Sequence, residues 1–194
     1  MRLVGKTIYL TGMLLALMVT MAHAVSLNIT PPIQAELDKW AAILTEWAAD
    51  PIIVNAVLEQ NSKGPIPELD NPKWKTIPRS DPLVKTFQTN PAGRFLTSKL
   101  EDSEWTVGEA FLSAARGEKV AFVEKTTSYI HRGQAKFDVP LTTGKPWQGQ
   151  AEFDESSDTY AIQLAVPVFA DGKPCGVLVA GITLGHLLLD LPKK

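Results

Sequence analysis

Side chains that can bind a small anion crowd into one short stretch of the chain, between a predicted strand and a predicted helix. Lys125, Tyr129, His131, Arg132 and Lys136 place several hydrogen-bond donors within residues 125–136. A guanidinium or ammonium group makes charge-assisted bonds to a carboxylate, and a tyrosine hydroxyl can orient the bound group. The stretch therefore predicts a pocket for a small molecule that bears a carboxylate. The alternative is a solvated polar loop, because charged side chains generally face water.

Two residues farther along the chain extend the predicted pocket. Trp147 follows Pro146, and it either walls the pocket or anchors its own loop. Asp154 opens the acidic turn 154–158 and could receive a ligand amine, while an ordinary turn held by Asx and Ser hydrogen bonds is the competing interpretation. The turn lacks the glycine and the alternating oxygen ligands of a calcium loop, so we expect no metal there.

The sequence contains few of the residues that an enzyme active site would need. His131 and His186 are the only histidines after residue 24, which excludes a three-histidine metal site, and Cys175 is the single cysteine. The chain has no Gly-x-Ser-x-Gly elbow and no phosphate-binding glycine loop. We therefore expect no metal, no cofactor and no enzyme activity, with an acid–base pair of Tyr129 and His131 held as a reserve alternative.

Residues 1–24 have the features of a cleaved signal peptide. Arg2 and Lys6 precede the mostly apolar run 8–21, and Ala-His-Ala at 22–24 is a small-residue cleavage pattern. The apolar run is short for a membrane span, so an uncleaved anchor is the second interpretation. We expect export to the periplasm.

Cleavage would leave 170 residues, enough for one domain with a full core. Because the first 24 residues hold two of the 19 basic residues and no acid, the mature chain carries 17 basic and 21 acidic residues. This mild acidity argues against nucleic acid as a partner. No second long apolar run follows, so we expect no further membrane helix and no attached output domain.

Residues 25–60 are predicted to form an N-terminal helical region. Thr30 is placed to cap a helix that begins at Pro31, and Asp50-Pro51 should end or kink it. Apolar residues recur at steps of four and three on both sides of that break: Ile33, Leu37, Trp40, Leu44, Trp47, Val54 and Leu58. The stripe either packs on this chain's own sheet or forms a homodimer seam.

Residues 61–82 are rich in Pro, Gly, Asn and Asp and predict a long ordered loop, with Trp74 as its anchor. Residues 83–190 form the predicted core domain. It opens with a helix in two pieces, broken at Asn90-Pro91, and contains a short helix or irregular turn near 134–141. Strands are expected at 105–114, 119–123, 150–153, 161–169 and 176–184, with a loop at 144–149 and a hairpin turn at 170–174 that joins the last two strands. Helices followed by antiparallel strands indicate an α+β fold.

The order of these elements, together with several short motifs, resembles the Cache (PDC) superfamily of extracytoplasmic sensor domains. Lys125, Thr126, Tyr129 and Lys136 match the loop string of one bacterial branch of that family, and Phe137 is a near match. Further matches lie at 153–157, 163–168, 171–174 and 176–182, so that the resemblance covers roughly residues 82–188. It implies a single Cache domain, a PAS-like antiparallel sheet behind a long N-terminal helix.

The same resemblance implies a function and shows where this chain departs from the pattern. It implies an exported sensor that binds a small organic ligand (a carboxylate, an amino acid or a similar molecule) and signals through a separate membrane partner, a histidine kinase or a transporter. Ser128, Gly133 and Gln134 stand where the branch usually has acids. These changes favour a neutral, zwitterionic or anionic ligand. The competing class is a periplasmic interaction protein with a degenerate sensor fold and no ligand.

Overall fold

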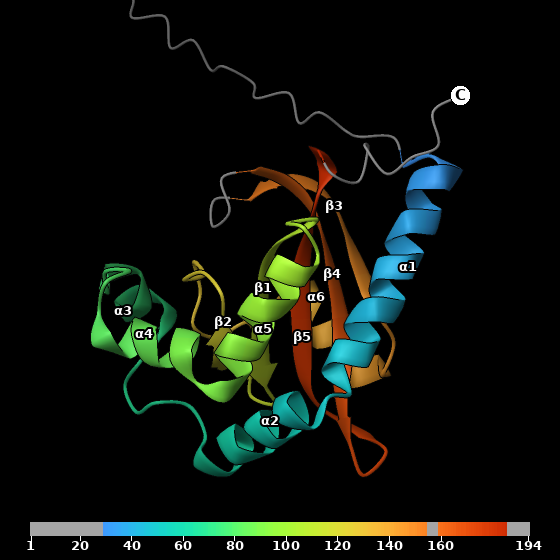
Figure 1. Cartoon of the computed structure of the whole chain (residues 1–194). Coiled ribbons are helices and arrows are strands. Elements are labelled where there is room, and N and C mark those ends of the chain that lie inside the picture. Colours follow the sequence, from blue (N-terminus) through green and yellow to red (C-terminus); the bar gives the residue numbers. More distant parts are fainter. Residues whose placement is uncertain (1–28, 155–158, 186–194) are drawn as a thin grey trace, which may run out of the picture.

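The computed structural model describes residues 29–154 and 159–185, in which helices cover both faces of one five-stranded antiparallel sheet (Figure 1). The predicted signal peptide lies outside the described residues, as do residues 155–158 of the acidic turn and His186. The helices are α1 (Pro31–Ala48), α2 (Pro51–Lys63), α3 (Asn71–Thr76), α4 (Pro82–Thr89), α5 (Pro91–Asp102) and α6 (Ala135–Thr143). The strands are β1 (Val107–Ala114), β2 (Lys119–Phe122), β3 (Trp147–Asp154), β4 (Thr159–Ala170) and β5 (Lys173–Thr183). The predicted α+β class is confirmed.

Four of the first five helices begin in the same way, with an Asp or Asn cap and a proline in the first turn. Asp50, Asp70, Asp81 and Asn90 each accept a hydrogen bond from a backbone N–H two or three residues farther on. Such a cap satisfies a donor that has no partner within the helix, and the proline removes another. The Thr30 side chain makes no cap bond to α1, so that part of the sequence prediction is wrong.

The break at Asp50-Pro51 changes which face of the N-terminal region is buried. The axes of α1 and α2 meet at 65°. Beyond the break Ile53 and Val57 are fully buried, whereas Val54 is half-buried and Leu58 is 44% exposed. The predicted continuation of the stripe through Val54 and Leu58 is therefore wrong by one residue, because the bend turns α2 about its axis relative to α1.

Within the described residues, no single helix is long and apolar enough to cross a membrane, whereas α1 and α2 pass this test of length and composition only as a bent pair.

The strand order in the sheet is β2-β1-β5-β4-β3, and every pair is antiparallel. The β4–β5 hairpin turns at Asp171 and Gly172, which both have positive φ, as a tight two-residue turn requires. The predicted hairpin there is confirmed. Strand β3 starts at Trp147, three residues before the predicted start, so part of the predicted loop at 144–149 belongs to the sheet.

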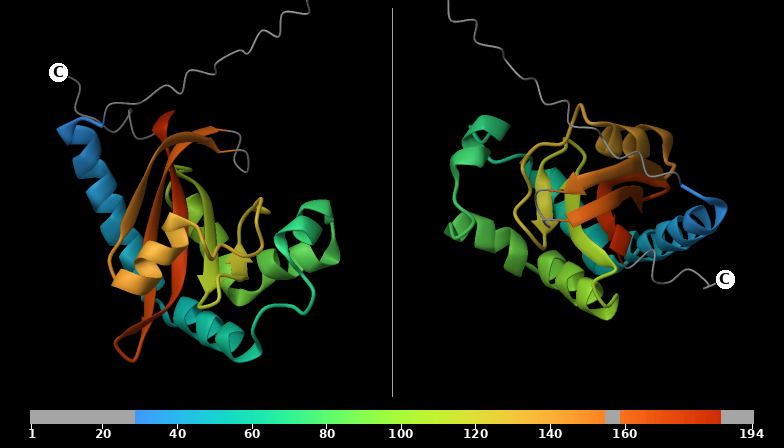
Figure 2. Two further views of the ribbon diagram at one scale, coloured as in Figure 1. Left: turned by 180° about the vertical axis from the view of Figure 1, so that it is seen from behind. Right: turned by 90° about the horizontal axis from the view of Figure 1, so that it is seen from above.

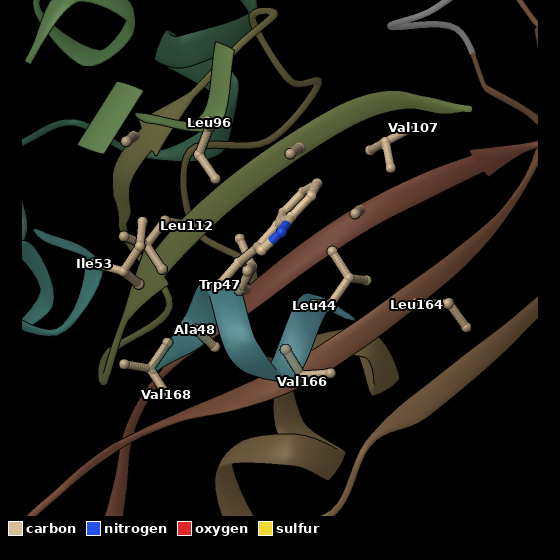
Figure 3. Close-up of a cluster of buried hydrophobic side chains, with 14 of the residues drawn as sticks. Leu44, Trp47, Ala48, Ile53, Leu96, Val107, Leu112, Leu164, Val166 and Val168 are labelled. Carbon is tan, nitrogen blue, oxygen red and sulfur yellow. The ribbon is translucent and has the colours of Figure 1, made fainter. Parts of the chain in front are cut away.

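The two faces of the sheet are covered by different helices. α1 packs on β4 and β5, and α2 and α5 pack on β1 (Figure 1). α6 lies on the opposite face, against β3, β4 and β5 (Figure 2). In Figure 3, Leu44 and Trp47 of α1 point into a cluster with Leu112, Leu164 and Val166 of the sheet. The α1 stripe is therefore core, as one of its two interpretations predicted, and the homodimer seam stays a prediction.

A second, aromatic cluster holds the loop that was predicted at 61–82. This segment contains the short helix α3, and its Trp74 is fully buried with Nε1 donating to the Thr126 carbonyl at 2.7 Å. The Trp74 ring meets the rings of Phe87, Phe122 and Tyr129 at centroid distances of 5.7–6.0 Å. The predicted anchoring role of Trp74 is confirmed.

Trp47→Ala should lower the free energy of unfolding by about 3–5 kcal/mol, because it removes a large buried side chain and leaves a cavity against the sheet. Leu58→Ala, on the exposed face of α2, should change it by less than about 0.5 kcal/mol. Urea denaturation of both variants measures the difference. A larger loss at Leu58 than at Trp47 would contradict the placement of the α1–α2 break.

Candidate ligand-binding site

A cavity of about 500 Å³ opens on the face of the sheet opposite α1. Its floor comes from strands and its sides from the loop before α6, from α6 itself and from β3. Its lining includes Glu109 and Phe111 of β1, His131, Lys136 of α6, Trp147 and Glu152 of β3, and Gln163 of β4. Successive side chains of a strand point to opposite faces, so Glu109 and Phe111 share this face while Ala110 and Leu112 belong to the core beneath α1.

The structure brings three of the predicted site residues to this cavity. His131 and Lys136 line it from the loop and from the first turn of α6, and Trp147 lines it from the start of β3. Asp154 ends β3, and its side chain lies outside the described part of the structure.

Three other predicted site residues lie elsewhere. Tyr129 is fully buried, and its hydroxyl accepts a hydrogen bond from the Ile66 N–H at 2.9 Å. Arg132 is exposed and donates to the Ala115 carbonyl at 3.0 Å. Lys125 is half-buried with its ammonium 4.5 Å from the Trp74 ring centroid. These contacts give each side chain a role apart from the cavity, and a ligand-binding role for them stays a prediction.

The lysine at 125 lies in a different depression, which it shares with Lys75, Arg79, Thr126 and Thr127. Partial burial lowers the pKa of Lys125, and the nearby charge of Arg79 lowers it further. The loop residues thus separate because residues 125–133 contain bends and a turn and do not run as one strand, so their side chains face different parts of the structure.

The floor of the cavity carries a chain of polar contacts that joins three elements. The Lys136 ammonium donates to Gln163 Oε1 at 3.0 Å, and Gln163 Nε2 donates to Glu109 Oε1 at 2.7 Å. Gly181 of β5 makes room for this arrangement, because a Cβ there would stand 2.9 Å from the Glu109 Cγ. The contacts tie α6 to β4 and β1, so a ligand that engages Lys136 would act directly on the position of α6.

Basic groups surround the Phe111 ring at one end of the cavity. The ammonium of Lys119 is 3.0 Å from the ring centroid and that of Lys136 is 5.6 Å from it, while the His131 ring centroid is 4.7 Å away. We call Lys119, His131 and Lys136 the basic wall. Its counterpart is acidic, because Glu109 and Glu152 also line the cavity.

Two members of the basic wall, Lys119 and His131, each have a buried side-chain nitrogen atom that makes no hydrogen bond to the described residues. Among the described residues, neither Lys119 Nζ nor His131 Nδ1 has a hydrogen-bond partner, although both side chains are almost completely buried. Burial lowers the pKa of Lys119 well below its usual value, the charge of Lys136 lowers it further, and Glu109 opposes the shift. Burial, then Lys119 and Lys136, likewise lower the pKa of His131 strongly, so its imidazole is neutral at pH 7.

Sequence reasoning missed the residues that come from strands. Glu109, Lys119 and Gln163 were assigned to strands without a functional role, although a polar residue on a buried strand face is the signal that could have found them. Although the loop has no acid at Ser128, Gly133 or Gln134, two carboxylates from strands, those of Glu109 and Glu152, line the cavity. The cavity therefore presents both signs of charge, which a zwitterionic ligand can match.

Within the described residues, no group of histidine, cysteine, aspartate and glutamate side chains is arranged to hold a metal ion.

Tyr129→Phe should lower the free energy of unfolding by about 1 kcal/mol, because it leaves the Ile66 N–H without its acceptor. Tyr160→Phe is the matched control, since Tyr160 is 52% exposed, and it should leave stability unchanged. Equal stability of Tyr129→Phe and the unsubstituted chain would argue against this structural role of the hydroxyl.

Lys119→Met should raise the free energy of unfolding at pH 7, because it replaces a buried amine that has no hydrogen bond by an apolar side chain of similar length. The unfolded chain keeps the amine near its ordinary pKa of 10.5, whereas folding lowers that pKa. Unfolding therefore takes up a proton, and stability falls as the pH falls below 10.5, by up to about 1.4 kcal/mol per pH unit, until the folded-state pKa is passed.

The advantage of Lys119→Met over the unsubstituted chain should consequently be larger at pH 7 than near pH 10. Denaturant titrations of both proteins at several pH values measure it. An advantage that does not change with pH would show that the amine is not neutralised by folding.

Comparison with known proteins adds the identity of the fold. No family model and no curated protein matches the chain. Among solved structures, it is similar to the sensor domain of the V. cholerae histidine kinase DctB, with a TM-score of 0.54 and 22% identity over 84% of this chain and 54% of that one. The sensory domain of the Campylobacter jejuni chemoreceptor Tlp3, with isoleucine bound, matches with a TM-score of 0.44 and 16% identity over 86% of this chain and 70% of that one.

This chain thus spans about half the length of the DctB sensor domain that it matches. The DctB sensor domain is a Cache (PDC) sensor domain. The resemblance found in the sequence is confirmed at the level of the fold: the chain has the fold of the Cache (PDC) sensor domains.

Proposed function

We propose that the chain is a sensor module whose cavity binds a small organic molecule bearing a carboxylate, such as an amino acid. The observation that carries this proposal is that Lys136 and His131 line one cavity of about 500 Å³ together with Glu109 and Glu152. A carboxylate fits beside Lys136 and His131, and an amine fits beside Glu109. The fold shared with the DctB sensor domain supports a sensory rather than an enzymatic role.

The contacts of α6 suggest how binding changes the structure. Lys136 holds α6 to the sheet through Gln163, so a ligand carboxylate at Lys136 would compete with the Gln163 amide. α6 packs on β4 and β5, and α1 packs on the other face of the same two strands. A shift of α6 would therefore reach α1 through two shared strands, which is the kind of small packing change that a sensor can transmit.

We further propose export to the periplasm and a membrane partner that reads the bound state. The signal-peptide features of residues 1–24 support export. The DctB sensor domain belongs, by its name, to a histidine kinase, and a separate kinase or transporter is the kind of partner proposed here. A homodimer through α1 would give such a partner a symmetric surface.

A thermal-shift screen of the full chain against amino acids, carboxylates, amines and purines tests the proposal. A ligand raises the melting temperature because it binds the folded state only, and we expect a shift of a few degrees at ligand concentrations about a hundredfold above Kd. Lys136→Met should abolish the shift, while Lys145→Met, an exposed lysine after α6, should retain it.

Two further outcomes decide between alternatives. Arg132→Ala should retain the shift, because its side chain bonds to Ala115 outside the cavity, and loss of the shift would favour the role that the sequence predicted. The second candidate function is an interaction protein without a ligand. This alternative is favoured by the hydrogen bonds from Lys136 to Gln163 and from Gln163 to Glu109, because these polar side chains on the cavity floor bond to one another and do not need a ligand as a partner. No shift with any compound at millimolar concentration would support that alternative.

A further inference from the structure

Two buried nitrogen atoms, Lys119 Nζ and His131 Nδ1, belong to side chains that pack against the Phe111 ring at the basic end of the cavity. Lys119 is fully buried on β2, and its ammonium lies against one side chain of the cavity lining, Phe111, at 3.0 Å from the ring centroid. His131 is 2% exposed, lines the cavity and packs against the same ring. Among the described residues, Lys119 Nζ and His131 Nδ1 accept or donate no hydrogen bond.

The charged groups that act on the Lys119 amine are one carboxylate, Glu109, and one ammonium, Lys136, so the negative charge beside the amine is offset by a positive one. β1 contributes Glu109 and the Ser113 hydroxyl, which is the register neighbour of Lys119 and is itself buried without a hydrogen bond. α6 contributes Lys136, and the loop before α6 contributes His131. Glu109 is the single acid among these groups, and it is also bonded to Gln163.

A buried amine or imidazole in such surroundings is more stable without its proton. Leaving water penalises the charged form, and the ammonium of Lys136 repels an added proton at either group. Burial and like charge lower the pKa of both groups in the structure. An anion placed beside the Phe111 ring would reverse that balance, because it attracts the missing proton across a medium of low dielectric constant.

We infer that a carboxylate binds at the basic wall together with a proton, which the solvent supplies and Lys119 or His131 accepts. This inference rests on the proposed function and concerns the regulation of the same site. The carboxylate arrives ionised, and the neutral nitrogen takes up one proton with its own lone pair. A buried ion pair replaces a neutral base, no other bond forms or breaks, and Lys119 acts through the Phe111 ring without touching the ligand.

The consequence is that acidity tightens binding. Each proton taken up makes the affinity for a carboxylate fall by up to about tenfold for each unit of pH increase between the pKa of the empty site and that of the occupied site. An exported protein meets the pH of its surroundings more directly than a cytoplasmic one does. Binding would then report the carboxylate and the proton together.

The test uses acetate, glutarate and γ-aminobutyrate as probes, because their carboxylates stay ionised from about pH 7 to about pH 9. Titration calorimetry and thermal shifts of the full chain give the affinity of each probe at about pH 7 and at about pH 9. Calorimetry in two buffers with different ionisation enthalpies counts the protons taken up. We expect at least one probe to bind several-fold more weakly at the higher pH, with net proton uptake.

Lys119→Met should remove most of this pH dependence, and His131→Gln should remove what remains toward lower pH. Lys125→Met is the matched control: Lys125 also lies over an aromatic ring, that of Trp74, but outside the cavity, so its variant should keep the full pH dependence. Lys136 is retained in all these variants, so a pH dependence that survives in the double variant Lys119→Met/His131→Gln comes from neither proposed acceptor and overturns the inference.

Two other results also overturn it. One is an affinity that is independent of pH in the unsubstituted chain, and the other is failure of all three probes to bind at either pH. The proposed function fails separately, only when the wider screen of amino acids, amines and purines also finds no ligand.

Discussion

Alternation of side chains along β1 and β4 is the constraint on which the other features depend. One face of these strands carries Ala110, Leu112, Leu164 and Val166, which pack under α1, α2 and α5. The other face carries Glu109, Phe111 and Gln163, which line the cavity. Because the period of a strand is two residues, a slip of one residue would exchange the faces and bury the carboxylate of Glu109 in the apolar core. The core and the site therefore share one register.

The apolar face provides the stability that lets the other face hold groups that are unfavourable in a protein interior. The core beneath α1 contains the large side chains Trp47, Leu44 and Ile53, whose burial drives folding. On the cavity face, Lys119 and His131 are buried with nitrogens that have no hydrogen bond among the described residues. Such groups lower stability and persist where the rest of the structure compensates, which is typical of functional sites.

Local signals in the sequence located most elements. The prolines after Asp50 and Asn90 predicted the helix boundaries, because a capped N-terminus with proline is a strictly local feature. The turn at Asp171-Gly172 predicted the β4–β5 hairpin for the same reason. The prediction failed at Val54 and Leu58, since the angle between α1 and α2 depends on packing against the sheet rather than on the sequence of either helix.

By itself, the sequence determined the class of the fold, the family that it resembles and the loop that contributes His131 and Lys136 to the cavity. Which side chains meet was decided only by the tertiary structure. Tyr129, Arg132 and Lys125 are neighbours of His131 along the chain, yet the bends and the turn of the loop place them at an aromatic cluster, at a backbone carbonyl and in a separate depression. Glu109 and Gln163 are distant from that loop in sequence, whereas Lys119 lies on the strand that precedes it, and the three meet because their strands lie in one sheet. Spacing along a chain fixes local geometry, whereas a binding site is an arrangement of residues that only the packing of the sheet brings together.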